Sequence, residues 1–295
     1  MHRILSFLLR AAAVLPLRAL HAVGFVLGWA MYGMSPTYRR HLRDNLGQAG
    51  LDAPATRRAA IAAAGQMIAE LPALWFRPRA KSLALVKGAE GVEAVLAARA
   101  AGKALLLLTP HHGCFEISAH YAAQLFPITV LYRAPKIAWL EPLMREGRAG
   151  DNLRLAPADV SGVRELFRAL ERGEAAGFLP DQVPGLGEGE WTEFFGKPAY
   201  TMTLAAKLAE RPNIATFLAY AQRLPKGEGY RIVVRPFPAK DSSETAARRL
   251  NRALEDLVRE CPEQYLWGYN RYKTPAGAEP PPGAGGNIPP APPVA

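Results

Sequence analysis

The apolar run LLLL at residues 105–108 constrains the fold of this chain more than any other feature. It lies within KALLLLTP, and a continuous apolar run that ends in a proline is typical of a strand buried on both faces of a sheet. The segment ITVLYRAP at 128–135 has the same form. Residues 163–170 have the apolar spacing of a helix and precede a third strand-like segment, AAGFLPD. Strands that alternate with helices predict an α/β fold.

Two further strand-like segments, NIATFLAYAQ and YRIVVRPFP, are separated only by the short stretch LPKGEG. We therefore expect this pair to be antiparallel. The fold class predicted is α/β, with a mixed central sheet and helices on both faces, preceded by an N-terminal membrane-associating helix. The domain bounds that we expect are 1–35 for this anchor, 36–273 for the globular domain, and 274–295 for a disordered tail rich in Pro, Gly and Ala.

The N-terminal segment, residues 4–34, is apolar and has no acidic residue. Interrupting basic residues and the lack of a clear cleavage site argue against a secretory signal. Its longest charge-free stretch, 19–34, is shorter than the roughly 20 residues that span a bilayer. Four basic residues share an arc of roughly 80° on a helical wheel: Arg3, Arg10, Arg18 and His21. We expect a helix that is broken at Pro16 and lies in the membrane interface; a spanning anchor and a buried core helix remain open alternatives.

The net charge of +10 favours an anionic partner, such as nucleic acid, a membrane surface, a phosphorylated substrate or an acidic carrier protein. Arg39, Arg40 and Arg43 directly follow the N-terminal segment, and there they predict contact with anionic headgroups on the cytoplasmic side. No nucleic-acid motif is present, so the predicted partner is a membrane and not nucleic acid. Cys114 and Cys261 lack metal-ligand spacing and predict neither a metal site nor a disulfide; for Cys114, packing is favoured over a nucleophilic role.

Polar residues follow the first three predicted strands, and in α/β sheets the loops beyond the carboxyl ends of strands build the site. These loops supply His111, His112, Glu116, Arg133, Lys136, Asp181 and Gln182. His111 and Glu116 diverge in a continuous helix or strand, so they meet only if Pro110 and Gly113 turn the chain between them. Glu116 then accepts a hydrogen bond from one imidazole nitrogen, and the other nitrogen takes a proton from an attacking hydroxyl. Two loop histidines and a glutamate at a helix N-terminus are the alternative.

These motifs occur in a recognisable order: HGCFE after a strand, YRAPK, GR at 147–148, LPDQ, FFGKPAYT and PEQYLWGYNRYK. In this order the chain resembles the late acyltransferases of lipid A biosynthesis, the lauroyl/myristoyl transferase family, from its N-terminal segment to about Lys273. That family is related to glycerolipid acyltransferases with an H-x4-D/E motif. The resemblance implies a glycerolipid-acyltransferase-like domain and a monotopic or single-pass enzyme at the cytoplasmic face of the inner membrane.

The resemblance also implies an activity. The enzyme transfers a fatty acyl chain from acyl carrier protein to the hydroxyl of a 3-hydroxyacyl chain on a lipid A precursor, without a cofactor or metal, and contacts inner membrane phospholipids. It implies that His111 is the general base with Glu116 as its partner, and that Arg148 and Asp181 are catalytic. Arg133, Lys136 and Gln182 are expected to bind substrate.

Several alternatives stay open. HHGCFE also fits the HHxxxD pattern of other acyltransferases, in which His112 would be the base. A relative that acylates another membrane lipid or a secondary-metabolite intermediate is the alternative function. EFFGKPAYTMT (193–203) is either a wall of the acyl channel or a loop on the sheet. QYLWGYNRYK either anchors at the interface through Trp267 and Tyr269, with Arg271 and Lys273 on phosphates, or completes the core. His120 is expected to be structural or exposed.

Overall fold

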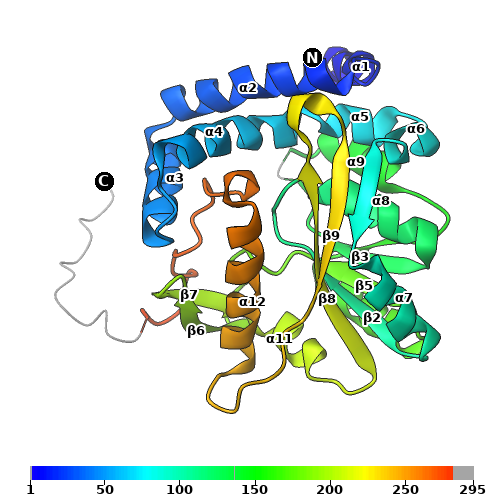
Figure 1. The fold of residues 1–295 in the computed structure, drawn as a ribbon, viewed down its shortest axis with the longest axis vertical. Helices are drawn as coiled ribbons and strands as arrows, with labels where there is room; N and C mark the ends of the chain where they lie inside the picture. The colour runs from blue at the N-terminus through cyan, green and yellow to red at the C-terminus, as the bar shows by residue number, and fades with distance from the viewer. Residues whose placement is uncertain (1, 136, 282–295) are drawn as a thin grey trace.

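The computed structural model describes residues 2–135 and 137–281, with the side chains from residue 6 onward (Figure 1). The prediction for Lys136 and most of the predicted tail lie outside the described residues. Residues 274–281 are described: Pro275 is buried, and the carbonyl of Glu279 accepts a hydrogen bond from the Trp191 indole at 3.1 Å.

The described chain contains a central seven-stranded sheet, and the strand order in it is β1-β9-β8-β2-β5-β3-β4. Its strands are β1 (Val86–Glu90), β2 (Ala104–Leu108), β3 (Ile128–Tyr132), β4 (Leu153–Pro157), β5 (Ala175–Phe178), β8 (Ile214–Arg223) and β9 (Tyr230–Pro236). The core strands β8, β2, β5, β3 and β4 run parallel, and β9 pairs antiparallel with β8. The predictions of a mixed sheet and of an antiparallel last pair are confirmed.

Helices cover both faces of this sheet, as predicted, and β2 shows why. Leu105 and Leu107 pack into one buried cluster with α7 (Val92–Ala100) and α8 (Phe115–Leu125). The alternate residues Leu106 and Leu108 pack into a second cluster. That cluster includes α10 (Val160–Glu171), α11 (Thr203–Ala209) and α12 (Ala246–Glu260). Figure 1 shows α12 and α7 on opposite sides of the strands. An unbroken apolar run is required here because successive residues face opposite helix layers.

Three parts of the fold were not predicted. β1 is mostly exposed, and β4 mixes buried and exposed residues, so neither carries the continuous apolar run of a central strand. The segment 193–203, predicted as a channel wall or loop, contributes to an antiparallel hairpin of β6 (Gly189–Phe194) and β7 (Lys197–Met202). Phe195 and Gly196 both have positive φ at its two-residue turn, which is the geometry that matches the twist of a hairpin.

The N-terminal residues form six helices before the sheet. These are α1 (His2–Ala12), α2 (Leu17–Met34), α3 (Pro36–Gln48), α4 (Pro54–Ala69), α5 (Leu71–Phe76) and α6 (Arg79–Leu83). The predicted break at Pro16 is confirmed. α2 and α4 run side by side across the top of the molecule (Figure 1). Their backbones are so close that a Cβ atom on Gly28 would lie 2.0 Å from the carbonyl oxygen of Ile61.

This packing corrects part of the N-terminal prediction. His21 does not face outward with the arginines: it is buried, and its Nε2 lies 3.3 Å from Oε2 of Glu70. Within the described chain one helical stretch, Pro54–Phe76, is long and apolar enough to cross a membrane by length and composition, and 61% of its apolar window is buried inside the protein. The apolar helix that meets this criterion is thus not the N-terminal one.

Candidate active site

His111 and Asp181 meet at the carboxyl ends of the adjacent strands β2 and β5. Nδ1 of His111 lies 2.9 Å from Oδ1 of Asp181, and the backbone N–H of His111 donates to Oδ2 at 2.9 Å. The carboxylate therefore holds both the ring and the backbone of one residue. Burial alone raises the pKa of Asp181, but the His111 charge and these hydrogen bonds outweigh it and lower the pKa below its usual value.

The other ring nitrogen of His111 is the one available to a substrate. Because ionised Asp181 only accepts hydrogen bonds, Nδ1 carries the proton and Nε2 presents a lone pair as an acceptor. The amide nitrogen of Gln182 lies 3.2 Å from Nε2, and the Phe115 ring centroid lies 5.1 Å from that of the imidazole. The His111 side chain retains 18% of its exposure, whereas Asp181 is buried at 3%. This arrangement can accept a proton at Nε2.

The neighbouring His112 is packed in the protein core. It is fully buried, its ring stacks on Tyr220 at a centroid distance of 4.2 Å, and its Nε2 donates to the carbonyl of Cys261 at 2.8 Å. Burial lowers the pKa of His112 to about 4, so the ring is neutral. A ring enclosed in this way cannot reach a substrate, which argues against the alternative that His112 is the base. Cys114 is also buried, and burial raises the pKa of its thiol well above the usual value.

The structure corrects the predicted partner of His111. Glu116 is the first acidic residue of α8, and it binds the guanidinium of Arg148 through two contacts, Nε to Oε1 at 2.6 Å and Nη2 to Oε2 at 2.7 Å. The indole of Trp75 donates a third hydrogen bond to Glu116 at 2.8 Å. Although burial raises the pKa of Glu116, Arg148 lowers it more, so the carboxylate is ionised. Glu116 therefore positions Arg148. Asp181 occupies the place beside His111 that was predicted for Glu116.

The turn between His111 and Glu116 depends on distant residues. Gly113 has φ +58°, and a Cβ there would lie 2.1 Å from the carbonyl oxygen of Ala221 on β8. Its own carbonyl accepts a hydrogen bond from Arg223 Nη2 at 2.8 Å, and Arg223 is paired with the buried Glu70. Burial raises the pKa of Glu70, but Arg223 and His21 lower it to about 2. Sequence reasoning missed this support because its members come from α2, the end of α4 and β8, with no shared motif.

The other residues predicted for the site or the membrane interface lie outside the His111–Asp181 pair. Arg133 follows β3 at the same sheet edge and is exposed. Arg271, predicted as a possible phosphate contact, is instead buried; it donates to the carbonyl of Tyr200 and to Thr201 Oγ1, both at 2.8 Å. Trp267 is buried at 2%, in agreement with the core alternative for its segment. In the described part of the chain, no cluster of three or more His, Cys, Asp or Glu is suited to a metal ion.

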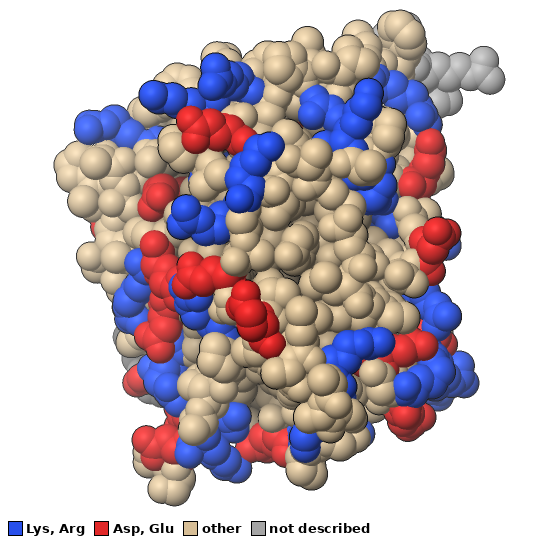
Figure 2. Space-filling model, turned by 45° about the vertical axis from the view of Figure 1, so that its right-hand side comes forward, with Lys and Arg blue, Asp and Glu red and all other residues tan. Residues whose placement is uncertain are grey.

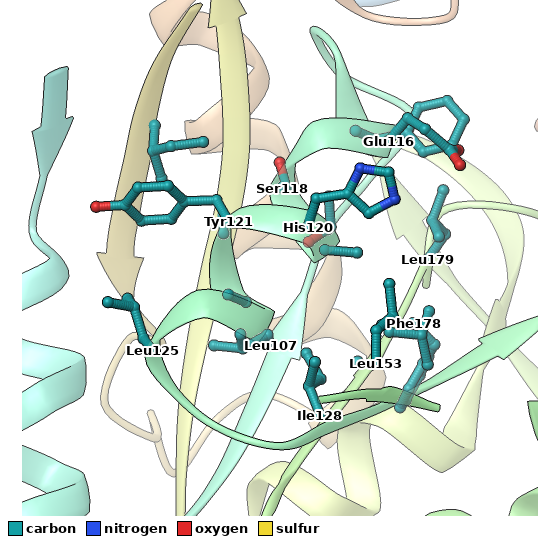
Figure 3. Close-up of a pocket in the computed structure, with 18 of the residues that line it drawn as sticks. Leu107, Glu116, Ser118, His120, Tyr121, Leu125, Ile128, Leu153, Phe178 and Leu179 are labelled. Atoms are coloured by element: carbon teal, nitrogen blue, oxygen red, sulfur yellow. The ribbon is translucent and has the colours of Figure 1, made fainter. Parts of the chain in front are cut away.

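A cavity opens below this edge, between α8 and the sheet (Figure 3). Its empty volume, with the open solvent at the mouth included, is about 910 Å³. Its walls are largely aliphatic and aromatic and include Leu107, Ile128, Leu153, Leu155, Phe178 and Leu179. Thr109, Phe115, Glu116 and Arg148 also line it, so the cavity begins beside the His111 loop.

The fold and site define an α/β enzyme with a histidine–carboxylate pair on loops next to a cavity with largely apolar walls. Comparison with known proteins identifies the family. Residues 3–274 match the family described as bacterial lipid A biosynthesis acyltransferase. The chain therefore belongs to this family and is an O-acyltransferase by class.

Individual relatives are similar at moderate identity. The chain is 26% identical over 217 residues to a lipid A biosynthesis lauroyltransferase of Escherichia coli (strain K12), and the alignment covers 71% of this chain and 69% of the relative. It is 30% identical over 187 residues to a lipid A biosynthesis acyltransferase of Haemophilus influenzae, with 60% and 56% covered. It is 25% identical over 215 residues to a lipid A biosynthesis palmitoleoyltransferase of E. coli, with 71% and 69% covered. The aligned part thus spans 56% to 69% of these relatives.

Proposed function

We propose that this chain transfers a fatty acyl group from acyl carrier protein to the hydroxyl of a 3-hydroxyacyl chain on a lipid A precursor. One observation carries the proposal: the His111–Asp181 pair lies on the two loops whose neighbouring residues line a cavity of hydrocarbon side chains. Thr109 and Leu179 line that cavity, and each lies two residues before one member of the pair. A chain held in the cavity would place its thioester beside Nε2 of His111.

The proposed reaction needs no nucleophile from the protein. Nε2 of His111 takes the proton of the acceptor hydroxyl as its oxygen attacks the thioester carbonyl carbon. The carbon–sulfur bond then breaks, and the departing thiolate receives the proton from the imidazolium. Asp181 stabilises that imidazolium and keeps Nδ1 protonated throughout. The products are the new ester and the free thiol of the carrier, and His111 returns to its starting state.

Arg148 is proposed to stabilise the negative charge that forms on the carbonyl oxygen. Its side chain is 20% exposed, lines the cavity, and is fixed by the two-point contact with Glu116. A guanidinium fixed before reaction stabilises an oxyanion more than a mobile one does, because no reorganisation is needed. Arg133 lies at the same edge and is proposed, with Lys136, to hold a phosphate of the precursor or of the carrier's phosphopantetheine. Gln182 is proposed to orient Nε2 until the substrate hydroxyl replaces it.

The N-terminal helices support a location at the cytoplasmic face of the inner membrane, in a monotopic arrangement. α2 buries Leu20, Gly24 and Gly28 against the protein, whereas its opposite face exposes Phe25 by 51% and Val26 by 65%. Exposed apolar patches of this kind mark interaction sites, including membrane sites. On the face shown in Figure 2, the upper part, where Figure 1 places α1 and α2, carries more basic than acidic side chains. The apolar face would enter the bilayer, and the basic residues would meet anionic phospholipid headgroups.

The test is mass spectrometry of a lipid A precursor incubated with the enzyme and a mixture of acyl carrier protein thioesters. We expect wild type and His41→Ala, a matched histidine on α3, to add the mass of one acyl chain, and His111→Ala to add none. Transfer by His111→Ala at the wild-type rate would refute the assigned base. No transfer by wild type, with donor and acceptor shown to be competent, would refute the proposed acceptor and favour another membrane lipid.

A further inference from the structure

His120 presents a buried polar group to the cavity that the proposed reaction does not use. It lies on α8, is 2% exposed and forms part of the cavity lining. Its Nδ1 is hydrogen-bonded by Nη1 of Arg79. Its Nε2 is buried and has no hydrogen-bond partner among the described residues. A buried polar atom without a partner costs free energy unless a ligand or water satisfies it.

The contact with Arg79 fixes the tautomer of this ring. A guanidinium donates hydrogen bonds and cannot accept them, so Nδ1 must be the acceptor. A neutral ring whose Nδ1 accepts carries its proton on Nε2. Burial, together with the charges of Arg79 and Arg148, lowers the pKa of His120 to about 3, which agrees with a neutral ring. His120 therefore offers one neutral N–H donor to the cavity.

The position of this donor identifies what it can bind. α8 connects the carboxyl end of β2 to the amino end of β3, so it descends from the His111 edge along the cavity. His120 is five residues beyond Phe115, which corresponds to about 7.5 Å along the helix axis. Figure 3 shows the ring projecting from α8 towards Leu179, near Glu116, with Phe178, Leu153, Leu125 and Ile128 lower down. An oxygen that meets Nε2 thus lies deeper in the cavity than a thioester held beside His111.

We propose that His120 Nε2–H binds an oxygen carried on the donor acyl chain, so that the enzyme accepts hydroxylated acyl thioesters. Glu116 and Arg148 line the cavity near the ring and bind each other, whereas the walls below it, such as Leu153 and Ile128, are apolar and exclude a charged headgroup deeper in the cavity. The hydroxyl of the acceptor is excluded because it must stand at His111 to react. This inference rests on the proposed acyl transfer and names the substrate class of the same site.

The test compares full-length wild type with two variants at this position. His120→Phe keeps a flat ring of similar size and removes the donor; His120→Gln keeps a side-chain N–H. For each enzyme, kcat/KM is measured with acyl carrier protein thioesters of one chain length, either unsubstituted or with a hydroxyl moved along the chain. For the best-placed hydroxyl, we expect His120→Phe to lower the ratio of hydroxylated to unsubstituted kcat/KM roughly tenfold, the scale of one hydrogen bond. His120→Gln should restore most of it.

The ratio within one enzyme cancels losses from misfolding or from general catalysis. An equal ratio in wild type and His120→Phe for every hydroxyl position would overturn the inference while leaving acyl transfer intact. Wild-type enzyme that transfers no acyl chain at all would instead refute the proposed function.

A second measurement needs only wild-type protein, labelled with 15N at histidine and titrated with unreactive thioether analogues of the same donors. We expect the hydroxylated analogue to shift the Nε2–H resonance of His120 more than the unsubstituted one. Identical shifts with both analogues would mean that water satisfies this donor, and would overturn the inference.

Discussion

Replacing Asp181 with asparagine should remove the general base without removing its histidine. The two carboxylate oxygens of Asp181 accept separate hydrogen bonds, one from Nδ1 and one from the backbone N–H of His111, each at 2.9 Å. Asparagine has one oxygen for these two donors. If that oxygen accepts from Nδ1, the amide group opposes the backbone N–H and leaves it unsatisfied, at a cost of about 1–3 kcal/mol.

The opposite orientation of asparagine avoids this cost by changing the imidazole. The amide oxygen then accepts from the backbone N–H, and the NH2 group donates to Nδ1. Nδ1 becomes the acceptor, so the proton moves to Nε2, and Nε2 loses the lone pair that takes the substrate proton. Loss of general-base catalysis corresponds to a fall in kcat of roughly 10²–10⁴-fold. Because the exchange conserves shape, KM and the free energy of unfolding should change little.

The assay is steady-state acyl transfer by four enzymes: wild type, Asp181→Asn, His111→Ala and the double variant. Residues that act as one unit are not additive, so the double variant should be no slower than His111→Ala alone. Glu116→Gln combined with His111→Ala is the matched control, and its effects should multiply, because Glu116 contacts Arg148 and Trp75 instead. If Asp181→Asn retains wild-type kcat, or if Glu116 and not Asp181 is coupled to His111, the assignment of the pair is refuted.

Two further predictions concern stability, each measured by chemical denaturation. Gly28→Leu should destabilise the protein by about 1–3 kcal/mol or more, because its Cβ would meet the Ile61 carbonyl. Gly33→Leu is the control and should not destabilise it, because the space around Gly33 is open. Equal effects of the two substitutions would contradict the close α2–α4 packing. His112 has a folded pKa of about 4 against 6.5 unfolded, a lowered value, so its contribution is complete above pH 6.5 and is lost as the pH falls towards 4. The loss should total about 3 kcal/mol and should disappear in His112→Gln; an unchanged slope in that variant would show that His112 is not buried as a neutral ring.

Much of the fold could be predicted because its signals are local. The apolar run at 105–108 indicates by itself a strand buried on both faces, because its successive side chains pack against the helix layers on opposite sides of the sheet. The spacing at 163–170 and the break at Pro16 likewise depend only on backbone geometry within a few residues. The loops of His111 and Asp181 could be placed at one sheet edge for the same reason: consecutive parallel strands present their carboxyl ends together.

Side-chain pairing within the site was decided by the tertiary structure. The sequence places Glu116 five residues from His111 and Asp181 seventy residues away, and proximity in the chain favoured the wrong partner. The neighbour of β2 in the sheet is β5, so register between strands brought Asp181 to the ring. Glu116 instead pairs with Arg148, which comes from another helix.

The burial of single residues was also outside the reach of the sequence. His111 and His112 are adjacent and chemically identical, yet one binds Asp181 and stays partly exposed, and the other is buried and stacks on Tyr220 of β8. His120 acquired its tautomer from Arg79 on α6. Periodicity determines which segments become strands and helices because it acts over a few residues. Which imidazole can accept a proton depends on contacts from several elements distant in the chain, and only the folded arrangement of those elements specifies them.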